Sequence, residues 1–530
     1  MKKYYFSESQ KIVLLSILSA LLLAVPFLSY NYGWLILISF APYLLLLQAI
    51  ASKKLSLAKK IFWGWLPGLA SMMIVVGWLL FSDRSQLQLN QAFSLFMLAL
   101  VYGLLVLILS LQYVVFSWLY FRCIKNPLNP WVFLLIPAFW VVAEFSRSVL
   151  LSLVTIGSGG SVGPYWNFGN LGFALAVTPL GFAARIVGLW GMSFAAVAIS
   201  LAWIWLFKKK FLWPVIIFAA VLVITMIGYF GWKTTSSSLS LGYLQYGLPL
   251  VDHQQLRAVW QKATTEAINQ GANTEKPSDV LVLPEYSGII GSSLLTPKAA
   301  QALLAPVLKN NGVVITTTED RSVVPRKNVL IAANQNANII GRQDKAFLIP
   351  IGEYLPYILE VVLRAGGQSS FVAKQRNNLY VAKGAANGMP LLVNNLKIAA
   401  QACSGAIAPE LFRQQVRQGG NVMTNPASPA GLLKATVYHE QSLQTARFMA
   451  MANARPYAQG AFGTYSFILN KDGSVEKINQ DFGFAYKSAT VGVPGRRTLY
   501  TILGEWVVVL SFIFTAAYFA YYIKRKKFDN

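Results

Sequence analysis

Long apolar runs set the organisation of the 530-residue sequence. A helix needs about 20 consecutive apolar residues to cross a hydrocarbon layer about 30 Å thick, and several runs reach that length. The first run follows two lysines, as a signal peptide would, but no small-residue cleavage site comes after it, so we expect a retained helix. We predict membrane-spanning helices at residues 11–30, 33–50, 62–81, 93–120, 131–150, 185–207, 212–232 and 503–523.

The pattern changes between the last two of these runs. Short apolar stretches with strand-like composition alternate there with helical patterns, and none is long enough to span a membrane. Strands are predicted at residues 238–244, 279–286, 312–319, 328–336, 396–403 and 421–426, and helices at residues 409–418 and 437–454. A segment of this length can bury its own core. We therefore expect transmembrane helices in 1–235, an inserted α/β domain in 236–497, and a last transmembrane helix with a basic tail in 498–530.

Basic residues gather on one side of the predicted spans. They precede the first span, follow the last, and occupy every second loop between: Lys2, Lys3, Lys53, Lys54, Lys59, Lys60, Arg122, Lys125, Lys208, Lys209, Lys210, Lys524, Arg525, Lys526 and Lys527. Cytoplasmic loops carry such an excess of Lys and Arg. We expect both termini in the cytoplasm and the inserted domain on the opposite side of the membrane.

Composition narrows the chemistry. The chain is 55% hydrophobic and only 12% charged, whereas soluble domains carry about 25% charged residues. The net charge of +25 is better explained by anionic lipid headgroups than by nucleic acid, because the tightest basic clusters flank apolar runs. Two cysteines and two histidines are too few for a zinc site built from Cys and His clusters, and we expect neither metal nor cofactor. A Ser-His-Asp triad would need His253 or His439, and neither lies in a nucleophile-elbow context.

The two cysteines are predicted on opposite sides of the membrane. Cys123 falls at the cytoplasmic edge of the fourth span, and Cys403 falls in the inserted domain. An intramolecular disulfide between them is then excluded by distance. Cys403 is a free thiol outside the cytoplasm and a candidate nucleophile, although a lone cysteine is also often a small buried apolar residue.

Three segments carry candidate chemistry: LVLPEYSG at 281–288, GRQDKAFLIPIGEYLP at 341–356 and AAQACSGAIAPELFR at 399–413. A thiol needs a base to become a nucleophile, and Glu285 is the candidate. Attack on an ester creates an oxyanion, which Lys345 and the amide after Cys403 can stabilise. Taken alone, Glu285 is a loop carboxylate and Lys345 a solvated lysine, and spacing does not show that the three side chains converge.

Together these strings resemble the Glu-Lys-Cys triad of the nitrilase superfamily. The string K-x-x-L-x-P-x-G-E-x-x-P at 345–356 resembles the membrane branch of that superfamily, the apolipoprotein N-acyltransferases. The segments WNFGNLGFALAVTPL at 166–180 and YHEQSLQTARFMAMANARP at 438–456 are similar to that family too, so the resemblance covers essentially the whole chain. It implies an eight-helix transmembrane bundle with an inserted nitrilase-like domain, an α-β-β-α sandwich.

The resemblance also implies roles. Glu285 would be the general base, Lys345 the oxyanion stabiliser, Cys403 the nucleophile and Glu353 a supporting carboxylate. The reaction would move an acyl chain from a phospholipid, through a thioester, to the N-terminal amine of a diacylglyceryl-cysteine apolipoprotein. The expected partners are the phospholipid donor, the lipid-anchored acceptor and the membrane, with no nucleic acid and a monomeric chain. The expected location is the cell inner membrane, with the inserted domain on the periplasmic face.

The chain departs from the family near the nucleophile. The family's Tyr-Glu after the cysteine is replaced by Ser404-Gly405, and residues 425–430 read NPASPA without the family's tryptophan. These differences leave two further interpretations open: a membrane amidase or an acyltransferase with another acceptor, and a non-enzymatic binding scaffold. The glycine-rich connection 151–184 is interpreted either as a mobile loop or as a lid or lipid-contacting loop over the inserted domain.

Overall fold

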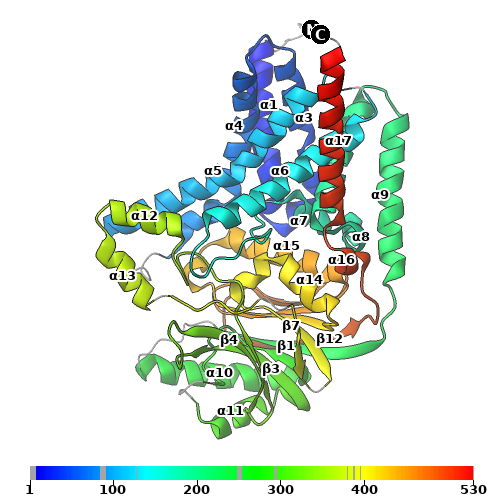
Figure 1. The fold of residues 1–530 in the computed structure, drawn as a ribbon. Coiled ribbons are helices and arrows are strands. Elements are labelled where there is room, and N and C mark those ends of the chain that lie inside the picture. Colours follow the sequence, from blue (N-terminus) through cyan, green and yellow to red (C-terminus); the bar gives the residue numbers. More distant parts are fainter. Residues whose placement is uncertain are drawn as a thin grey trace, which may run out of the picture.

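The computed structural model describes residues 7–83, 91–127, 129–246, 254–291, 295–378, 380–385, 388–393 and 395–528. Lys2, Lys3 and His253 of the sequence interpretation lie outside the described residues. Figure 1 shows a helical bundle on one side of the molecule and two sheets on the other, with α14 and α15 between them.

Within the described residues, eight helices are long and apolar enough to cross a membrane: 8–27, 30–51, 57–81, 94–123, 132–154, 179–207, 212–231 and 506–524. Each corresponds to a predicted span, so this prediction is confirmed and the chain is a multi-pass membrane protein. The described helices of the bundle are α1 (Glu8–Ala24), η1 (Val25–Phe27), η2 (Tyr30–Leu35), α2 (Ile36–Ser39), α3 (Ala41–Ala51), α4 (Leu57–Val75), η3 (Gly77–Phe81), α5 (Gln91–Cys123), α6 (Val132–Val154), α7 (Leu171–Ala176), η5 (Pro179–Ala183), α8 (Ala184–Phe207), α9 (Leu212–Gly231) and α17 (Trp506–Phe528).

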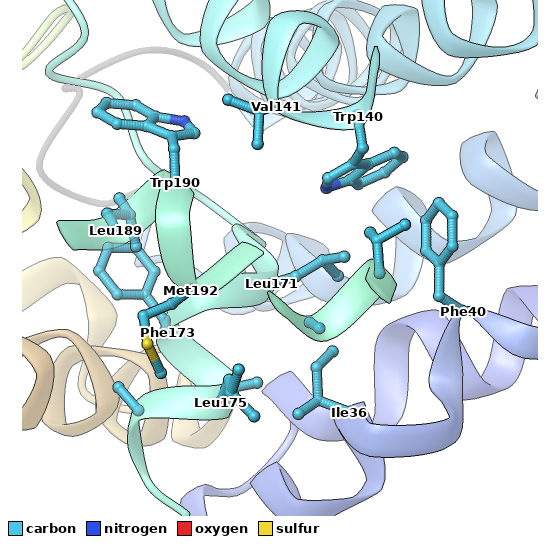
Figure 2. Packing of buried hydrophobic residues seen from close by; sticks show 14 of the residues in the cluster. Ile36, Phe40, Trp140, Val141, Leu171, Phe173, Leu175, Leu189, Trp190 and Met192 are labelled. Atoms are coloured by element: carbon cyan, nitrogen blue, oxygen red, sulfur yellow. The ribbon is translucent and has the colours of Figure 1, made fainter. Parts of the chain in front are cut away.

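The connection between α6 and α8 is packed into the bundle rather than loosely attached. It contains the short helix α7, whose residues 171–176 are all buried. Figure 2 shows Leu171, Phe173 and Leu175 of this helix among side chains of the surrounding helices, including Trp140 and Trp190. The interpretation of 151–184 as a freely mobile loop does not fit this burial.

The inserted domain contains two sheets, each six-stranded within the described residues, with strand orders β12-β1-β2-β3-β4-β5 and β11-β10-β9-β8-β7-β6. The strands are β1 (Ser237–Gln245), β2 (Ser278–Val282), β3 (Leu308–Asp320), β4 (Lys327–Asn334), β5 (Ile339–Asp344), β6 (Leu391–Val393), β7 (Leu396–Ala400), β8 (Val422–Ala427), β9 (Tyr457–Ala461), β10 (Ser466–Leu469), β11 (Val475–Asn479) and β12 (Ala485–Val493). Apolar side chains of both sheets, such as Val282, Ile315, Ile398 and Val422, form one buried cluster. The sheets therefore pack face to face.

Helices cover the outer faces of this sandwich. Those of the domain are α10 (Gln254–Thr274), α11 (Pro297–Leu304), α12 (Tyr357–Ala365), α13 (Ser369–Asn378), η6 (Cys403–Ile407), α14 (Pro409–Arg417), η7 (Ala430–Leu432), α15 (Thr436–Asn453) and α16 (Leu499–Leu503). Helices α10 and α11 lie on the side away from the bundle, and α14 and α15 lie on the side facing it (Figure 1). The predicted α-β-β-α arrangement is confirmed, whereas the domain boundaries at 235 and 497 stay a prediction.

Polar contacts join α15 to the loops of the bundle. The carboxylate of Glu440 accepts hydrogen bonds from Ser29 Oγ and from the backbone N–H of Tyr30, both at 2.9 Å. One turn further on, Gln444 Nε2 donates to the carbonyl oxygen of Pro26 at 2.8 Å. Buried hydrogen bonds to a charged group contribute about 1.5–3 kcal/mol each. The domain is thus held against the bundle through its inner helix layer.

Candidate active site

Glu285 follows strand β2 by three residues and is 6% exposed. Its backbone N–H donates to the carbonyl oxygen of Ala427 in the other sheet over 3.4 Å. The next residue, Tyr286, has a positive φ of 54° and donates its N–H to Thr317 Oγ1 at 2.9 Å. A left-handed non-glycine residue is strained and persists only when its surroundings fix it. The backbone that follows β2 therefore holds the Glu285 carboxylate in a fixed position.

Lys345 follows strand β5, and its side chain reaches the Glu285 carboxylate. Its N–H donates to the carbonyl oxygen of Asn328 at 2.8 Å, which fixes the backbone. Its ammonium donates to Glu285 Oε1 at 3.1 Å and to Glu353 Oε1 at 2.9 Å. An ammonium has three protons to donate, so a third remains for another acceptor beyond these two carboxylates.

Glu353 is bound from three directions. Besides Lys345, the side chain of Asn328 donates to Glu353 Oε1 at 2.5 Å, and the backbone N–H of Ile349 donates to Glu353 Oε2 at 2.8 Å. Both oxygens of this carboxylate are occupied by structural partners. Of the two carboxylates, Glu285 is therefore the one placed to exchange a proton, while Glu353 holds the ammonium.

Cys403 follows the end of β7 by three residues and begins the short helix η6. Its φ of 42° is in the left-handed region, and the side-chain amide of Asn425 donates to its carbonyl oxygen at 3.4 Å and to that of Gln401 at 2.7 Å. The Cys403 thiol lies near enough to Glu285 to act towards a lower pKa of that carboxyl, and the backbone N–H of Ser428 acts towards a lower pKa of the thiol. The structure thus brings Glu285, Lys345, Glu353 and Cys403 together.

Electrostatics assign different protonation states to these groups. Burial, with the charge of Glu285, raises the pKa of the Cys403 thiol to about 12. Burial also raises the pKa of Glu285, although Lys345 opposes the shift. Burial acts to lower the pKa of Lys345, but the two carboxylates outweigh it and the pKa lies well above its ordinary value. The resting site therefore holds a neutral thiol, a base of raised strength and a permanent positive charge.

Several residues of the site were not singled out from the sequence as functional. Asn328 and Asn425 hold Glu353 and the Cys403 turn through side-chain amides. Ser404 donates its hydroxyl to the carbonyl oxygen of Phe347 at 2.7 Å. This bond links the turn that carries Cys403 to residues 346–357, the loop that follows Lys345 (the lysine loop). Asparagines and serines are frequent throughout the chain, so only their contacts in the folded structure distinguish these three residues from the others.

The site lies on the side of the domain that faces the bundle. Phe347, two residues after Lys345, packs against Trp166 of the α6–α8 connection with ring centroids 4.9 Å apart. Tyr438 of α15, whose pKa is raised by burial and then by the nearby Cys403, packs against Trp78 of η3 with ring centroids 5.0 Å apart. An apolar cavity of about 270 Å³ lies beside the Glu353 loop and is lined by Leu79, Ser82, Asp83, Met97, Leu98, Val101, Pro350, Ile351, Gly352, Leu355, Phe371 and Gln375.

The sequence matches one family model and several known relatives. Residues 19–202 match the family described as the apolipoprotein N-acyltransferase N-terminal domain. The apolipoprotein N-acyltransferase of Geobacter metallireducens is 26% identical and covers 95% of this chain and 94% of its own length. That of Photobacterium profundum is 23% identical over 95% of this chain and 93% of its own length.

Solved structures resemble about half of the chain. A carbon-nitrogen hydrolase from Helicobacter pylori covers 48% of this chain and 89% of its own, with 16% identity and a TM-score of 0.35. An amidase from Nesterenkonia covers 48% of this chain and 90% of its own, with 13% identity and a TM-score of 0.30. The sequence matches extend across both the helical bundle and the inserted domain. The resemblance to the apolipoprotein N-acyltransferases that the sequence motifs indicated is therefore confirmed over most of the chain.

Proposed function

We propose that this chain transfers an acyl chain from a phospholipid to Cys403 as a thioester, and from there to the N-terminal amine of a lipid-anchored apolipoprotein. The observation that carries the proposal is the Lys345 ammonium, held between Glu285 and Glu353 beside the Cys403 thiol. This group of residues provides a nucleophile, a base and a positive charge in one buried pocket.

The first step forms the thioester. Cys403 Sγ attacks the carbonyl carbon of the sn-1 ester while Glu285 takes the thiol proton, which a thiol of pKa about 12 does not lose unaided. The oxyanion that forms accepts the remaining proton of the Lys345 ammonium as a hydrogen bond. The carbon–oxygen bond to the glycerol then breaks, and the departing alkoxide takes the proton from Glu285. Lysophospholipid leaves, and the acyl chain remains on Cys403.

The second step consumes the thioester. The free α-amine of a diacylglyceryl-cysteine attacks the thioester carbon and gives a proton to Glu285. Lys345 again stabilises the oxyanion. The carbon–sulfur bond breaks, the thiolate recovers a proton from Glu285, and an amide is released. Glu353 keeps both oxygens on fixed donors and acts through Lys345 in both steps.

The position of the site suits lipid substrates. Exposing an acyl chain to water costs about 0.8 kcal/mol per methylene, so a site for such chains belongs next to an apolar path. The cavity beside the Glu353 loop is mostly apolar and lies between the inserted domain and the start of α5. We propose that it accommodates part of an acyl chain. The basic loops at the opposite end of the bundle support an inner-membrane topology with the site on the periplasmic face.

A second candidate function is hydrolysis by the same thioester route, as in an amidase. It is favoured by one observation, the absence of the family's Tyr-Glu pair after the nucleophile, since Ser404 and Gly405 stand there. Water would then replace the amine in the second step.

One reconstitution experiment separates the two functions. The purified chain is placed in nanodiscs with phospholipid carrying a radiolabelled sn-1 chain, with and without a synthetic diacylglyceryl-cysteine lipopeptide. The proposal predicts label in the lipopeptide as an amide, and none when the lipopeptide amine is acetylated. Release of free fatty acid at the same rate with and without lipopeptide would contradict transfer and support hydrolysis.

A further inference from the structure

Helix α6 carries a polar face inside the apolar bundle. Glu144, Ser148 and Ser152 are spaced four residues apart, and Arg147 lies beside Ser148. Residues at this spacing lie one above another on a helix. All four side chains are buried, with Glu144 and Arg147 at 0% and 2% exposure. Charged groups inside a bundle are costly and are retained where they bind something.

What this face binds is the connection that follows it in the chain. Glu144 Oε1 accepts from the backbone N–H of Leu171 at 3.0 Å, and Arg147 Nη2 donates to Asn170 Oδ1 at 2.7 Å. Ser148 donates to Asn167 Oδ1 at 3.1 Å, and Ser152 donates to the carbonyl oxygen of Gly163. As the helix is followed towards its end, the partners run backwards from 171 to 163. The connection therefore folds back along the last turns of α6.

This arrangement solves a backbone problem. Val154, the last residue of α6, is ten positions beyond Glu144, a rise of about 15 Å along the helix. Because Glu144 binds Leu171, α7 begins at the depth of Glu144 and not at the end of α6. Residues 163–170 form no regular helix or strand, and irregular backbone at membrane depth is tolerated only where its polar groups are bound by protein. The polar face supplies those partners, and Asn167 adds its own bond to the carbonyl oxygen of Pro164 at 3.0 Å.

The same segment packs against the loop that follows Lys345 of the candidate active site. Tyr165 and Trp166 lie between the held residues Gly163 and Asn167, and both rings contact Phe347, at 5.6 and 4.9 Å. The carbonyl oxygen of Phe347 accepts the hydroxyl of Ser404, next to the nucleophile. An unbroken series of contacts therefore leads from the α6 face to the turn that carries Cys403.

The end of α6 also holds the lysine loop directly. Tyr354, which follows Glu353, donates its hydroxyl to the carbonyl oxygen of Thr155 at 2.8 Å. The backbone N–H of Tyr357 donates to the carbonyl oxygen of Ile156 at 2.9 Å. The 163–167 segment and the 346–357 loop are therefore both held by α6 and the residues at its end.

We propose that Glu144, Arg147, Ser148 and Ser152 are positioning residues, which seat Tyr165 and Trp166 against Phe347 and so shape the pocket in which the lipid ester is presented to Cys403. This rests on the proposed function for the nature of the substrate. The four residues do not touch the thiol, and the Glu285–Lys345–Glu353 contacts do not depend on them. Their loss should impair lipid acylation of Cys403 while leaving the intrinsic reactivity of the thiol in place.

The test compares Glu144→Leu with Glu144→Gln, which keeps an oxygen for Leu171, and adds the double variant Ser148→Ala/Ser152→Ala. Thr225→Val is the control, because this buried hydroxyl donates to the carbonyl oxygen of Val221 within its own helix α9. Hydrogen exchange of the 157–171 peptide is measured in nanodiscs. The rates of Cys403 acylation by labelled phospholipid and alkylation by iodoacetamide are measured on the same samples, with Cys123→Ala as background.

We expect Glu144→Leu and the double variant to raise exchange in 163–171 at least tenfold and to slow lipid acylation at least tenfold, with iodoacetamide alkylation within twofold. Glu144→Gln and Thr225→Val should stay within threefold throughout. Unchanged exchange, or acylation and alkylation falling together with the folded fraction, would overturn the proposal. If the wild-type chain takes no acyl group from phospholipid, the proposed function fails by itself. The positioning role is then tested by hydrogen exchange and by the ratio of Cys403 alkylation with long-chain and short haloacetamides. A lower ratio in Glu144→Leu, with raised exchange, supports it, and an unchanged ratio contradicts it.

Discussion

The ammonium of Lys345 lies 3.1 Å from the carboxylate of Glu285, and each side chain is only 4% exposed. The two residues are 60 positions apart in the sequence and come from the ends of two strands of one sheet. Glu353 completes the group on the other side of the ammonium. A buried charge of this kind is stable only while its partners remain. Each member is therefore expected to matter for folding as well as for chemistry.

Replacing Lys345 by Met should lower both the stability of the fold and the rate of the reaction. Two buried carboxylates would lose their common cation, which typically costs about 3–5 kcal/mol, and the oxyanion would lose a donor, which typically costs 10²–10³-fold in rate. Burial already raises the pKa of Glu285, and Lys345 opposes that shift, so the pKa of Glu285 would rise further without the lysine. A proton bound to Glu285 then favours the folded state at low pH, and this support is lost as pH rises. Thermal unfolding of Lys345→Met should therefore show a smaller deficit at pH 5 than at pH 8. A deficit independent of pH would contradict the assignment of charges.

Replacing Glu285 by Gln should separate thiol reactivity from catalysis. The charge of Glu285 raises the pKa of Cys403, so its removal lowers that pKa and increases the thiolate fraction at pH 8. In a Cys123→Ala background, iodoacetamide should alkylate Cys403 faster in Glu285→Gln than in the parent, while acylation by phospholipid falls at least a hundredfold because the base is gone. Parallel loss of both rates would show that Glu285 acts only on the fold.

The parent chain itself makes a related prediction. With a pKa of about 12 at Cys403, the thiolate fraction increases about tenfold per pH unit below that value. The alkylation rate, measured by mass spectrometry of the peptide containing Cys403, should keep rising from pH 7 to pH 10. A plateau reached by pH 8 would mean that the thiol ionises without a base.

Asn425 should be required for the geometry of the nucleophile. Asn425→Leu removes both hydrogen bonds to the Cys403 turn and leaves the buried carbonyl oxygen of Gln401 without this donor, at a cost of about 1–3 kcal/mol. We expect a slower acylation rate at saturating lipid, with little change in the lipid concentration for half-maximal rate. The matched control is Asn336→Ala, an exposed asparagine in a distant turn. Equal effects of the two substitutions would remove Asn425 from the site.

Gly405, two residues after the nucleophile, stands where this chain has no room for a side chain. A Cβ added at Gly405 would lie 2.7 Å from Gln401 Cβ, which cannot move away as a flexible side-chain end could. Gly405→Glu should therefore destabilise this chain by about 1–3 kcal/mol through overpacking. Ser404→Ala, which removes one hydrogen bond to Phe347, should cost less. Thermal unfolding of the two variants, side by side, tests this order.

The sequence predicted the fold where the pattern is regular. The transmembrane runs and strands such as β2, β4 and β7 were recognised because their apolar residues are continuous and their ends are marked by polar residues. The convergence of Glu285, Lys345 and Cys403 was available only through the family resemblance, since no spacing rule connects the ends of separate strands. Helix α7 was missed because six apolar residues in a glycine-rich connection give no periodic signal.

The supporting residues were missed for a different reason. Asn328 sits within β4 and Asn425 within β8, positions where a polar residue alone gives no indication of its partner. The buried Glu144 and Arg147 interrupt an otherwise apolar span, and that interruption was the one sequence signal that could have indicated the α6 polar face. Their partners, however, are backbone and amide groups of an irregular segment, and the sequence alone does not identify such partners.

The most direct measurement is the site of acylation. The purified chain is incubated with phospholipid carrying a labelled sn-1 acyl chain and no acceptor, quenched in acid, digested and analysed by mass spectrometry. The account predicts one acyl group per chain on the peptide containing Cys403, released by neutral hydroxylamine as a thioester and absent from Cys403→Ala. An acyl group on any other residue, or its persistence in Cys403→Ala, would contradict the account.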